Sequence, residues 1–308
     1  MKRLPIRLAS LAQGKPNPWE VRPPKRSDLF RNSGQALLVI LLIMAVALTI
    51  GLAITSRTVT DVEISSQTEE AARAFSAAEA GIEEALVGIG TTTFGGGFGE
   101  GVSYTTKRDL LGASSQFLFP EATRADEVRT LWLAEYPDTQ SYMADSLILY
   151  WGNYDSGERP ALEATIYFKI GSDYKVIRYT LDSESRDPDN GFCRPGDGSP
   201  RCDGVLEFIK NGSFPIGGKT ARNKTTLDLL PASGGTLLFV RLRLLYANEA
   251  TQVVGAEAVV GSLPSQGVKI ESTGLAGTST RKVEVVRMHP APPGIFDFLL
   301  YSGGDLSK

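Results

Sequence analysis

Two cysteines form the clearest reactive pair in the sequence. Cys193 and Cys202 are the only cysteines among 308 residues, and they flank a loop rich in glycine and proline, CRPGDGSPRC. A disulfide that closes this loop fits a protein folded in an oxidising compartment. Two free thiols are the alternative that the sequence leaves open. A zinc site is not expected, because His289 is the only histidine and no second cysteine pair exists.

Aspartates around the cysteines offer a second kind of chemistry. The segment SRDPDNGFCRPGDGSPRC interleaves carboxylates with glycines, and carboxylate oxygens are ligands that Ca²⁺ prefers. The spacing does not follow the helix–loop–helix calcium pattern, because no acidic residue stands where that pattern has its bidentate glutamate. Surface turns use the same residue types for backbone reasons. We therefore expect no metal site, and the weaker alternative is calcium at Asp187, Asp189 and Asp197.

Catalytic motifs are not found in the sequence. It has no G-x-S-x-G, H-E-x-x-H or phosphate-loop pattern, and its single histidine precedes a proline. The run GGGFGEG follows a predicted helix and precedes a predicted strand, which is the wrong order for a phosphate-binding glycine loop. No pair of carboxylates stands out in an apolar setting. The sequence predicts neither an enzyme nor a bound cofactor, and its net charge of −3 does not point to nucleic acid.

An uncharged apolar run at 36–54 is the most distinctive element. It is 19 residues long, and about 20 helical residues cross the hydrocarbon core of a bilayer. A secretory signal would have a shorter apolar region, about 7–15 residues, and a buried core helix would show a polar face. Eight basic and two acidic residues lie in 1–34, whereas two basic and seven acidic residues lie in 55–89. This asymmetry predicts a single-pass protein with a cytoplasmic N-terminus and an extracytoplasmic C-terminal domain.

The apolar run continues into a longer helix without a stop signal. We expect a basic, proline-containing, disordered leader at 1–34 and one helix at 35–89, with 36–54 as its transmembrane half. The outer half carries an apolar stripe that would pack on a globular domain. The members of this stripe are Phe75, Ile82, Leu86 and Ile89.

A change of period after the helix predicts a sheet domain. A flexible glycine-rich linker is expected at 90–102, a β-rich domain at 103–290 and a C-terminal tail at 291–308. The tail would dock on the sheet through Phe296, Phe298 and Tyr301. Alternating segments predict strands at 146–151, 162–170, 174–181, 205–209, 236–246, 252–260, 267–271 and 281–288. The second and third of these form a hairpin across GSD, and Arg241 and Arg243 share one face of the fifth. The fold class is therefore α+β: a long N-terminal transmembrane and amphipathic helix packed on a mostly antiparallel sheet.

The sequence GQALLVILLIMAVALTIGLAITSRTVTDVEISSQTEEAARAFSAAEAGIEEAL resembles the N-terminal segment of PilX-type minor pilins, within the type IV pilin-like proteins. The resemblance covers residues 34–87 and is weaker over the last predicted strands. It rests on a small apolar opening at 34–38 and on the signature AF-x-A-AEAG-x-E-x-AL, here Ala74, Phe75, Ala77, Ala78, Glu79, Ala80, Gly81, Glu83, Ala85 and Leu86.

The resemblance implies a set of processing steps and partners. A prepilin peptidase would cut between Gly34 and Gln35, and the new N-terminus would be methylated. The helix would stay in the inner membrane until the subunit joins other pilin subunits and the pilus assembly machinery at the cell surface. Val39 occupies the fifth mature position, where most major pilins have glutamate, and this departure points to a minor subunit.

Two alternatives remain open at the level of the sequence. A pseudopilin of a type II secretion system would have the same architecture in a different machine. An uncleaved, signal-anchored surface protein would use the helix only as an anchor, and its sheet domain would bind calcium or a glycan. Cleavage at Gly34 distinguishes the pilin-like proteins from the anchored one.

Overall fold

A computed structural model describes residues 33–88, 92–99, 101–125, 127–186, 188–232, 234–247 and 252–294. Residues 1–32 of the predicted leader at 1–34 lie outside these residues, as do Ile89, Asp187 and the tail aromatics at 296, 298 and 301. The chain divides into two compact units, Met1–Ser65 and Ser66–Lys308. They are described separately below.

One helix, α1 (Ser33–Val87), contributes to both units. Its observed bounds lie within two residues of those expected at each end. The sequence contains no proline between these bounds and is rich in alanine, leucine and glutamate, which are strong helix formers. Within the first unit every described side chain of α1, from 35 to 65, is exposed. The expected long apolar helix at the N-terminal side is therefore present.

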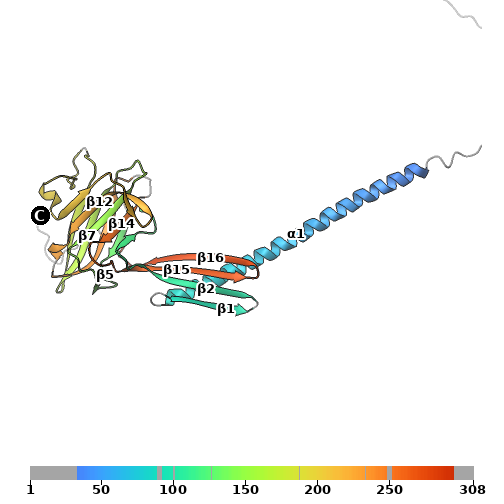
Figure 1. Ribbon diagram of the computed structural model, residues 1–308, viewed down its shortest axis with the longest axis horizontal. Helices are drawn as coiled ribbons and strands as arrows, with labels where there is room; N and C mark the ends of the chain where they lie inside the picture. The colour runs from blue at the N-terminus through green and yellow to red at the C-terminus, as the bar shows by residue number, and fades with distance from the viewer. Residues whose placement is uncertain are drawn as a thin grey trace, which may run out of the picture. The chain divides into compact units, whose positions relative to one another are not determined.

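The last turns of α1 pack on a four-stranded antiparallel sheet of order β1-β2-β15-β16 (Figure 1). The strands are β1 (Thr92–Gly99), β2 (Val102–Gly112), β15 (Ser265–Ala276) and β16 (Ser279–Met288). Ile82 and Ala85 of the helix are buried with Val268 and Ile270 of β15. The sheet is therefore built from segments at both ends of the globular unit, and the helix covers it.

The expected flexible linker at 90–102 is wrong over the part that the structure describes. Residues 92–99 form strand β1, which pairs with β2 in antiparallel register. Its glycines are needed where the strand approaches its neighbour, because an added Cβ would lie 2.7 Å from the Tyr104 carbonyl oxygen at Gly95 and 2.4 Å from the Tyr104 hydroxyl at Gly96. Close packing, and not flexibility, thus accounts for these two glycines.

Two further antiparallel sheets share the main hydrophobic core. The larger has the order β10-β12-β7-β14-β3, with β11 beside β12, and the smaller has the order β4-β13-β8-β9. Leu149 of β7 and Ile166 of β8 are both fully buried in this core. The bounds are β3 (Gln116–Leu118), β4 (Val128–Trp132), β7 (Ser146–Asn153), β8 (Ala161–Ile170), β9 (Asp173–Leu181), β10 (Val205–Ile209), β11 (Phe214–Ile216), β12 (Lys219–Asp228), β13 (Thr236–Leu245) and β14 (Val254–Ala258).

Short elements complete the described fold. Strands β5 (Ala134–Glu135) and β6 (Thr139–Gln140) form a two-stranded ribbon, and two short 3-10 helices cover Pro200–Cys202 and Leu230–Ala232. All eight expected strands are found, and the expected hairpin is confirmed as β8–β9. The domain is mostly antiparallel sheet beside one long helix, as the α+β prediction states.

Arg241 and Arg243, which were predicted to share one face of β13, make different contacts. Arg241 is 4% exposed, and its Nη1 donates to the Pro292 carbonyl oxygen at 2.7 Å. Arg243 Nη1 lies 3.8 Å from Glu163 Oε2 on the neighbouring strand β8. The segment at Pro292 thus covers one of the two arginines.

Candidate functional site

The apolar part of α1, residues 36–54, presents the most distinctive surface of the protein. Its large apolar side chains are between 51% exposed at Val46 and 66% exposed at Leu38 and Leu48. In the described part of the chain, α1 is the one helix long and apolar enough to cross a membrane by length and composition. Helical residues rise about 1.5 Å each, so this segment matches the hydrocarbon core of a bilayer, roughly 30 Å thick.

Hydroxyl groups along the same helix are bonded within it. Thr49 Oγ1 donates to the Val46 carbonyl oxygen at 2.8 Å, and Thr55 Oγ1 donates to the Gly51 carbonyl oxygen at 2.9 Å. Thr58 and Thr60 make the same kind of bond one turn back, each at 3.0 Å. A polar group without a partner is costly in hydrocarbon, so the bond at Thr49 suits the segment 36–54 to an apolar surrounding, and the other three continue the pattern just beyond it.

The predicted processing junction lies at the start of this helix. Ser33 is the first residue of α1, so the bond between Gly34 and Gln35 belongs to its first turn, and the Gln35 side chain is exposed. The first four backbone N–H groups of a helix have no partner within the helix. The backbone of this first turn is therefore held by fewer hydrogen bonds than the backbone further along the helix.

The outer end of α1 makes a close contact with β15 through small residues. A Cβ added to Gly274 would lie 1.9 Å from the carbonyl oxygen of Ala74 and 2.7 Å from the backbone nitrogen of Ala78. Both alanines have no exposed surface. The contact therefore brings two backbones together, and it requires glycine on the strand and small residues on the helix.

The structure explains why position 81, the glycine of the AEAG signature, is occupied by glycine. An added Cβ would lie 2.2 Å from Thr106 Oγ1 and 2.4 Å from Ser272 Oγ. These two hydroxyls are fully buried and bond to each other at 2.9 Å, joining β2 to β15. The helix lies directly on this hydroxyl pair, which the sequence motif alone does not reveal.

Only part of the predicted apolar stripe contacts the sheet. Ile82 is 7% exposed and Leu86 packs against the same cluster, but Phe75 is 46% exposed. The expected packing of Phe75 is therefore not found, since it is not among the buried or partly buried residues of this cluster. Ile89 lies outside the described residues.

Polar contacts that sequence reasoning missed fix the helix at two further points. Glu70 Oε2 accepts hydrogen bonds from the backbone nitrogen and the hydroxyl of Thr278, each at 3.0 Å, in the β15–β16 turn. The Tyr104 hydroxyl donates to the Glu84 carboxylate. This bond to Glu84 raises the pKa of the Tyr104 hydroxyl. No sequence motif marks either pair.

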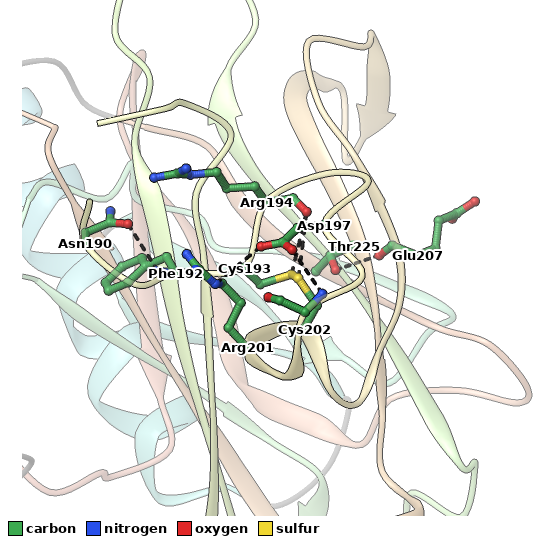
Figure 2. The surroundings of a disulfide bond; sticks show 10 residues. Asn190, Phe192, Cys193, Arg194, Asp197, Arg201, Cys202, Glu207 and Thr225 are labelled. Carbon is green, nitrogen blue, oxygen red and sulfur yellow. Dashed lines mark hydrogen bonds and ion pairs between the residues drawn. A yellow bond between two sulfur atoms is a disulfide. The ribbon is translucent and has the colours of Figure 1, made fainter. Parts of the chain in front are cut away.

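The predicted disulfide is present between Cys193 and Cys202 (Figure 2). It closes the loop that carries Asp197, whose Oδ2 lies 3.4 Å from Arg201 Nε. The backbone N–H of Cys193 also donates to the Thr180 carbonyl oxygen at 2.9 Å. The loop is therefore held both by the covalent bond and by strand β9. Both sulfurs belong to this bond, so the free-thiol alternative is wrong.

The two described calcium candidates are held by cations and backbone N–H groups. Asp189 accepts hydrogen bonds from Arg194 Nη2 at 2.7 Å and from Arg201 Nη1 at 3.1 Å. The backbone N–H of Gly191, followed by Arg201, lowers the pKa of Asp189, and the backbone N–H of Ser199 lowers that of Asp197. Among the described residues, no three potential metal ligands gather in one place, and Asp187 lies outside them.

Comparisons of the chain with known families, with curated proteins and with solved structures found no match. The functional interpretation therefore rests on the helix and its contacts. One half of α1 has an apolar surface exposed along its whole length. The other half is fixed to a sheet by backbone contact, buried apolar residues and hydrogen bonds.

Proposed function

We propose that this protein is a PilX-like minor pilin, a structural and assembly subunit of a type IV pilus. Its apolar helix half would hold the subunit in the inner membrane before it enters the fibre. The observation that carries the proposal is the division of α1 into an exposed apolar half and a half fixed to a sheet. A subunit drawn out of a membrane needs both features in one helix.

The exchange of surroundings has a simple physical basis. In the bilayer, lipid tails cover the apolar side chains of 36–54. In a fibre, the same side chains of neighbouring subunits would cover one another, so little apolar surface would meet water at either stage. Helix packing in the absence of water depends mainly on close contact and on satisfied polar groups. The intrahelical hydroxyl bonds at Thr49 and Thr55 support this behaviour.

The contact between α1 and the four-stranded sheet would transmit force in such an assembly. Pulling on the helix loads the Gly274–Ala74 backbone contact and the hydrogen bonds of Glu70 to the β15–β16 turn. Both are short-range contacts, and β15 is paired along most of its length with β16 on one side and β2 on the other. The proposal therefore assigns a mechanical role to this contact and no catalytic role to the chain.

Processing at Gly34 is the first step that the proposal requires. In the proposed topology the leader is cytoplasmic and the disulfide loop is extracytoplasmic, where disulfides persist. A prepilin peptidase would remove residues 1–34 and leave Gln35 as the N-terminus.

A matched pair of glycine variants tests this step. Gly34→Leu should abolish cleavage and leave the full-length chain in the membrane, because the added side chain occupies the position next to the scissile bond. Gly51→Leu lies in the same helix, in space with no other atom within 4 Å, and should be cleaved normally. Both variants are followed by intact mass of protein extracted from membranes of a cell that contains the peptidase. Normal maturation of Gly34→Leu would refute the proposed processing site.

A further inference from the structure

A cleft opens on the sheet β4-β13-β8-β9, where β8 ends and β9 begins. Its volume is about 470 Å³, within the range of roughly 300–1,000 Å³ that is usual for small-molecule sites. Trp132 of β4, Phe239 of β13, Lys169 of β8 and Tyr174 of β9 all line it. Each of the four strands of the sheet thus contributes at least one residue to the cleft.

Strand register explains why aromatic rings gather here. Phe239 pairs with Trp132 on one side and with Tyr167 on the other, and directly paired residues place their side chains on the same face of a sheet. The ring centroids of Phe239 lie 5.1 Å from Trp132 and 4.7 Å from Tyr167. The next residue of β13, Val240, is fully buried in the main core on the other face. The aromatic row therefore belongs to the face away from that core.

The ring of Tyr174 offers a platform to a ligand. Its side chain is 72% exposed, although a tyrosine ring gains by burial. Lys169 Nζ lies 5.5 Å from the ring centroid, and the two residues are paired across β8 and β9. The lysine holds the ring from one side and leaves most of its surface accessible.

Polar groups around the cleft can bind hydroxyl groups. Asp138, in the turn between β5 and β6, supplies a carboxylate, Lys169 an ammonium group and Thr236 a hydroxyl. Trp132 is only 6% exposed, and its Nε1 has no hydrogen-bond partner within the described residues. An indole N–H can only donate, and leaving it unpaired is costly. The polar groups that line the cleft and are available to a ligand are therefore those of Asp138, Lys169 and Thr236.

We propose that this cleft is a carbohydrate-binding site that takes a neutral sugar ring. The face of an aromatic ring carries partial negative charge, which attracts the polarised C–H groups of a sugar, while the sugar hydroxyls bond to the rim. The described lining residues carry one carboxylate and one ammonium group, so the site favours a neutral ligand over an anionic one. An apolar peptide would leave these charges without partners. The inference stands on the sheet domain alone and does not depend on cleavage at Gly34.

Ligand-observed saturation-transfer NMR on the full-length protein in a sugar-free detergent tests the proposal. The probes are the methyl glycosides of glucose, galactose, mannose and N-acetylglucosamine, with methyl glucuronide as the anionic comparison. At least one neutral probe should show transfer, and the glucuronide should show less. Tyr174→Ala should weaken the dissociation constant about threefold to tenfold, the expected contribution of one aromatic stacking contact. Asp138→Asn should also weaken binding.

An exposed aromatic on a different sheet provides the control. Phe98 of β1 is 62% exposed, and Phe98→Ala should leave the dissociation constant unchanged. Circular dichroism confirms that each variant is folded. The proposal is overturned if none of the neutral probes binds, if the glucuronide binds best, or if Tyr174→Ala and Phe98→Ala have equal effects.

Discussion

The two halves of α1 have the same backbone geometry but opposite relations to the rest of the chain. Residues 36–54 are mostly leucine, isoleucine, valine and alanine, and they are exposed throughout. Residues 66–87 are mostly alanine and glutamate, and their small side chains at Ala74, Ala78 and Ala85 have no exposed surface. The more apolar half is thus the exposed one, which reverses the usual arrangement of a protein in water.

This reversal shows what each half must satisfy. A surface that faces lipid or a neighbouring apolar helix needs hydrophobicity, and its exact shape within one chain matters little. A surface that packs on a sheet of its own chain must fit that sheet closely, so glycine and alanine stand where the two backbones meet. Equivalent substitutions in the two halves should therefore have very different effects on the globular unit.

Isoleucines in the two halves give the largest expected contrast. Ile82 is 7% exposed and Ile50 is 54% exposed. Ile82→Ala should lower the free energy of unfolding of the globular unit by about 2–4 kcal/mol, because it leaves a cavity against Val268 and Ile270. Ile50→Ala should leave that free energy unchanged. Urea unfolding in detergent, followed by tryptophan fluorescence, measures both variants, and equal values would contradict the comparison.

Glycines in the two halves give the next contrast. Gly81→Ala should lower the free energy of unfolding by about 2 kcal/mol, because its Cβ would press on the buried hydroxyls of Thr106 and Ser272. Gly51→Ala adds a better helix former in open space and should stabilise the helix by about 1 kcal/mol or less. Thermal unfolding of the two variants tests the sign. A stabilised Gly81→Ala would show that the helix does not lie on this hydroxyl pair.

Two adjacent glutamates, on the half of α1 that packs on the sheet, distinguish the effect of a tertiary hydrogen bond from that of an exposed charge. Glu70→Ala should cost about 1 kcal/mol, because Thr278 loses a shared acceptor in the β15–β16 turn. Glu69→Ala removes only an exposed ion pair with Arg73 and should cost a few tenths, about 0.3 kcal/mol. Hydrogen exchange at the Thr278 amide gives a local measure. Equal protection in both variants would rule out the Glu70 contact.

The stability of the four-stranded sheet beneath the helix should depend slightly on pH in the acid range. Glu271 lies 2.8 Å from Lys269 and 2.7 Å from Lys282, and these two lysines lower its pKa from 4.5 to about 2. A lowered pKa stabilises the folded state at pH values above 4.5, and this contribution disappears as the pH falls through about 2.

Stability curves of two glutamine variants measure this acid dependence. Glu271→Gln should flatten the acid limb between those pH values, whereas Glu79→Gln, an exposed position on α1, should not. If both variants retain the wild-type slope, the two lysines do not hold the Glu271 carboxylate in the folded sheet.

Elements with a strong hydrophobic period could be predicted from the sequence, whereas elements without such a period were missed. The long helix and the β8–β9 hairpin follow from composition and alternation. Strand β12 was missed because it buries Asn223 and Thr225, polar residues that do not mark a core strand. Strand β1 was missed because its glycines, which suggest a flexible loop, are required by the nearby Tyr104.

The candidate site, like the fold, could be predicted only in part from the sequence. The apolar run, the cysteine pair and Gly81 as part of a motif are visible in the sequence. The backbone contact of Gly274 with Ala74 joins residues 200 positions apart in the chain, and no local pattern specifies such a pair. The aromatic row of the cleft likewise depends on the register of three strands.

The most direct test of the proposed pilin function is the mature N-terminus of the protein taken from its own membranes. Intact-mass and N-terminal analysis should give a chain that begins at methylated Gln35 and lacks residues 1–34. A chain that begins near Met1 would contradict the account, since the exposed half of α1 would then be a membrane anchor and not an assembly element.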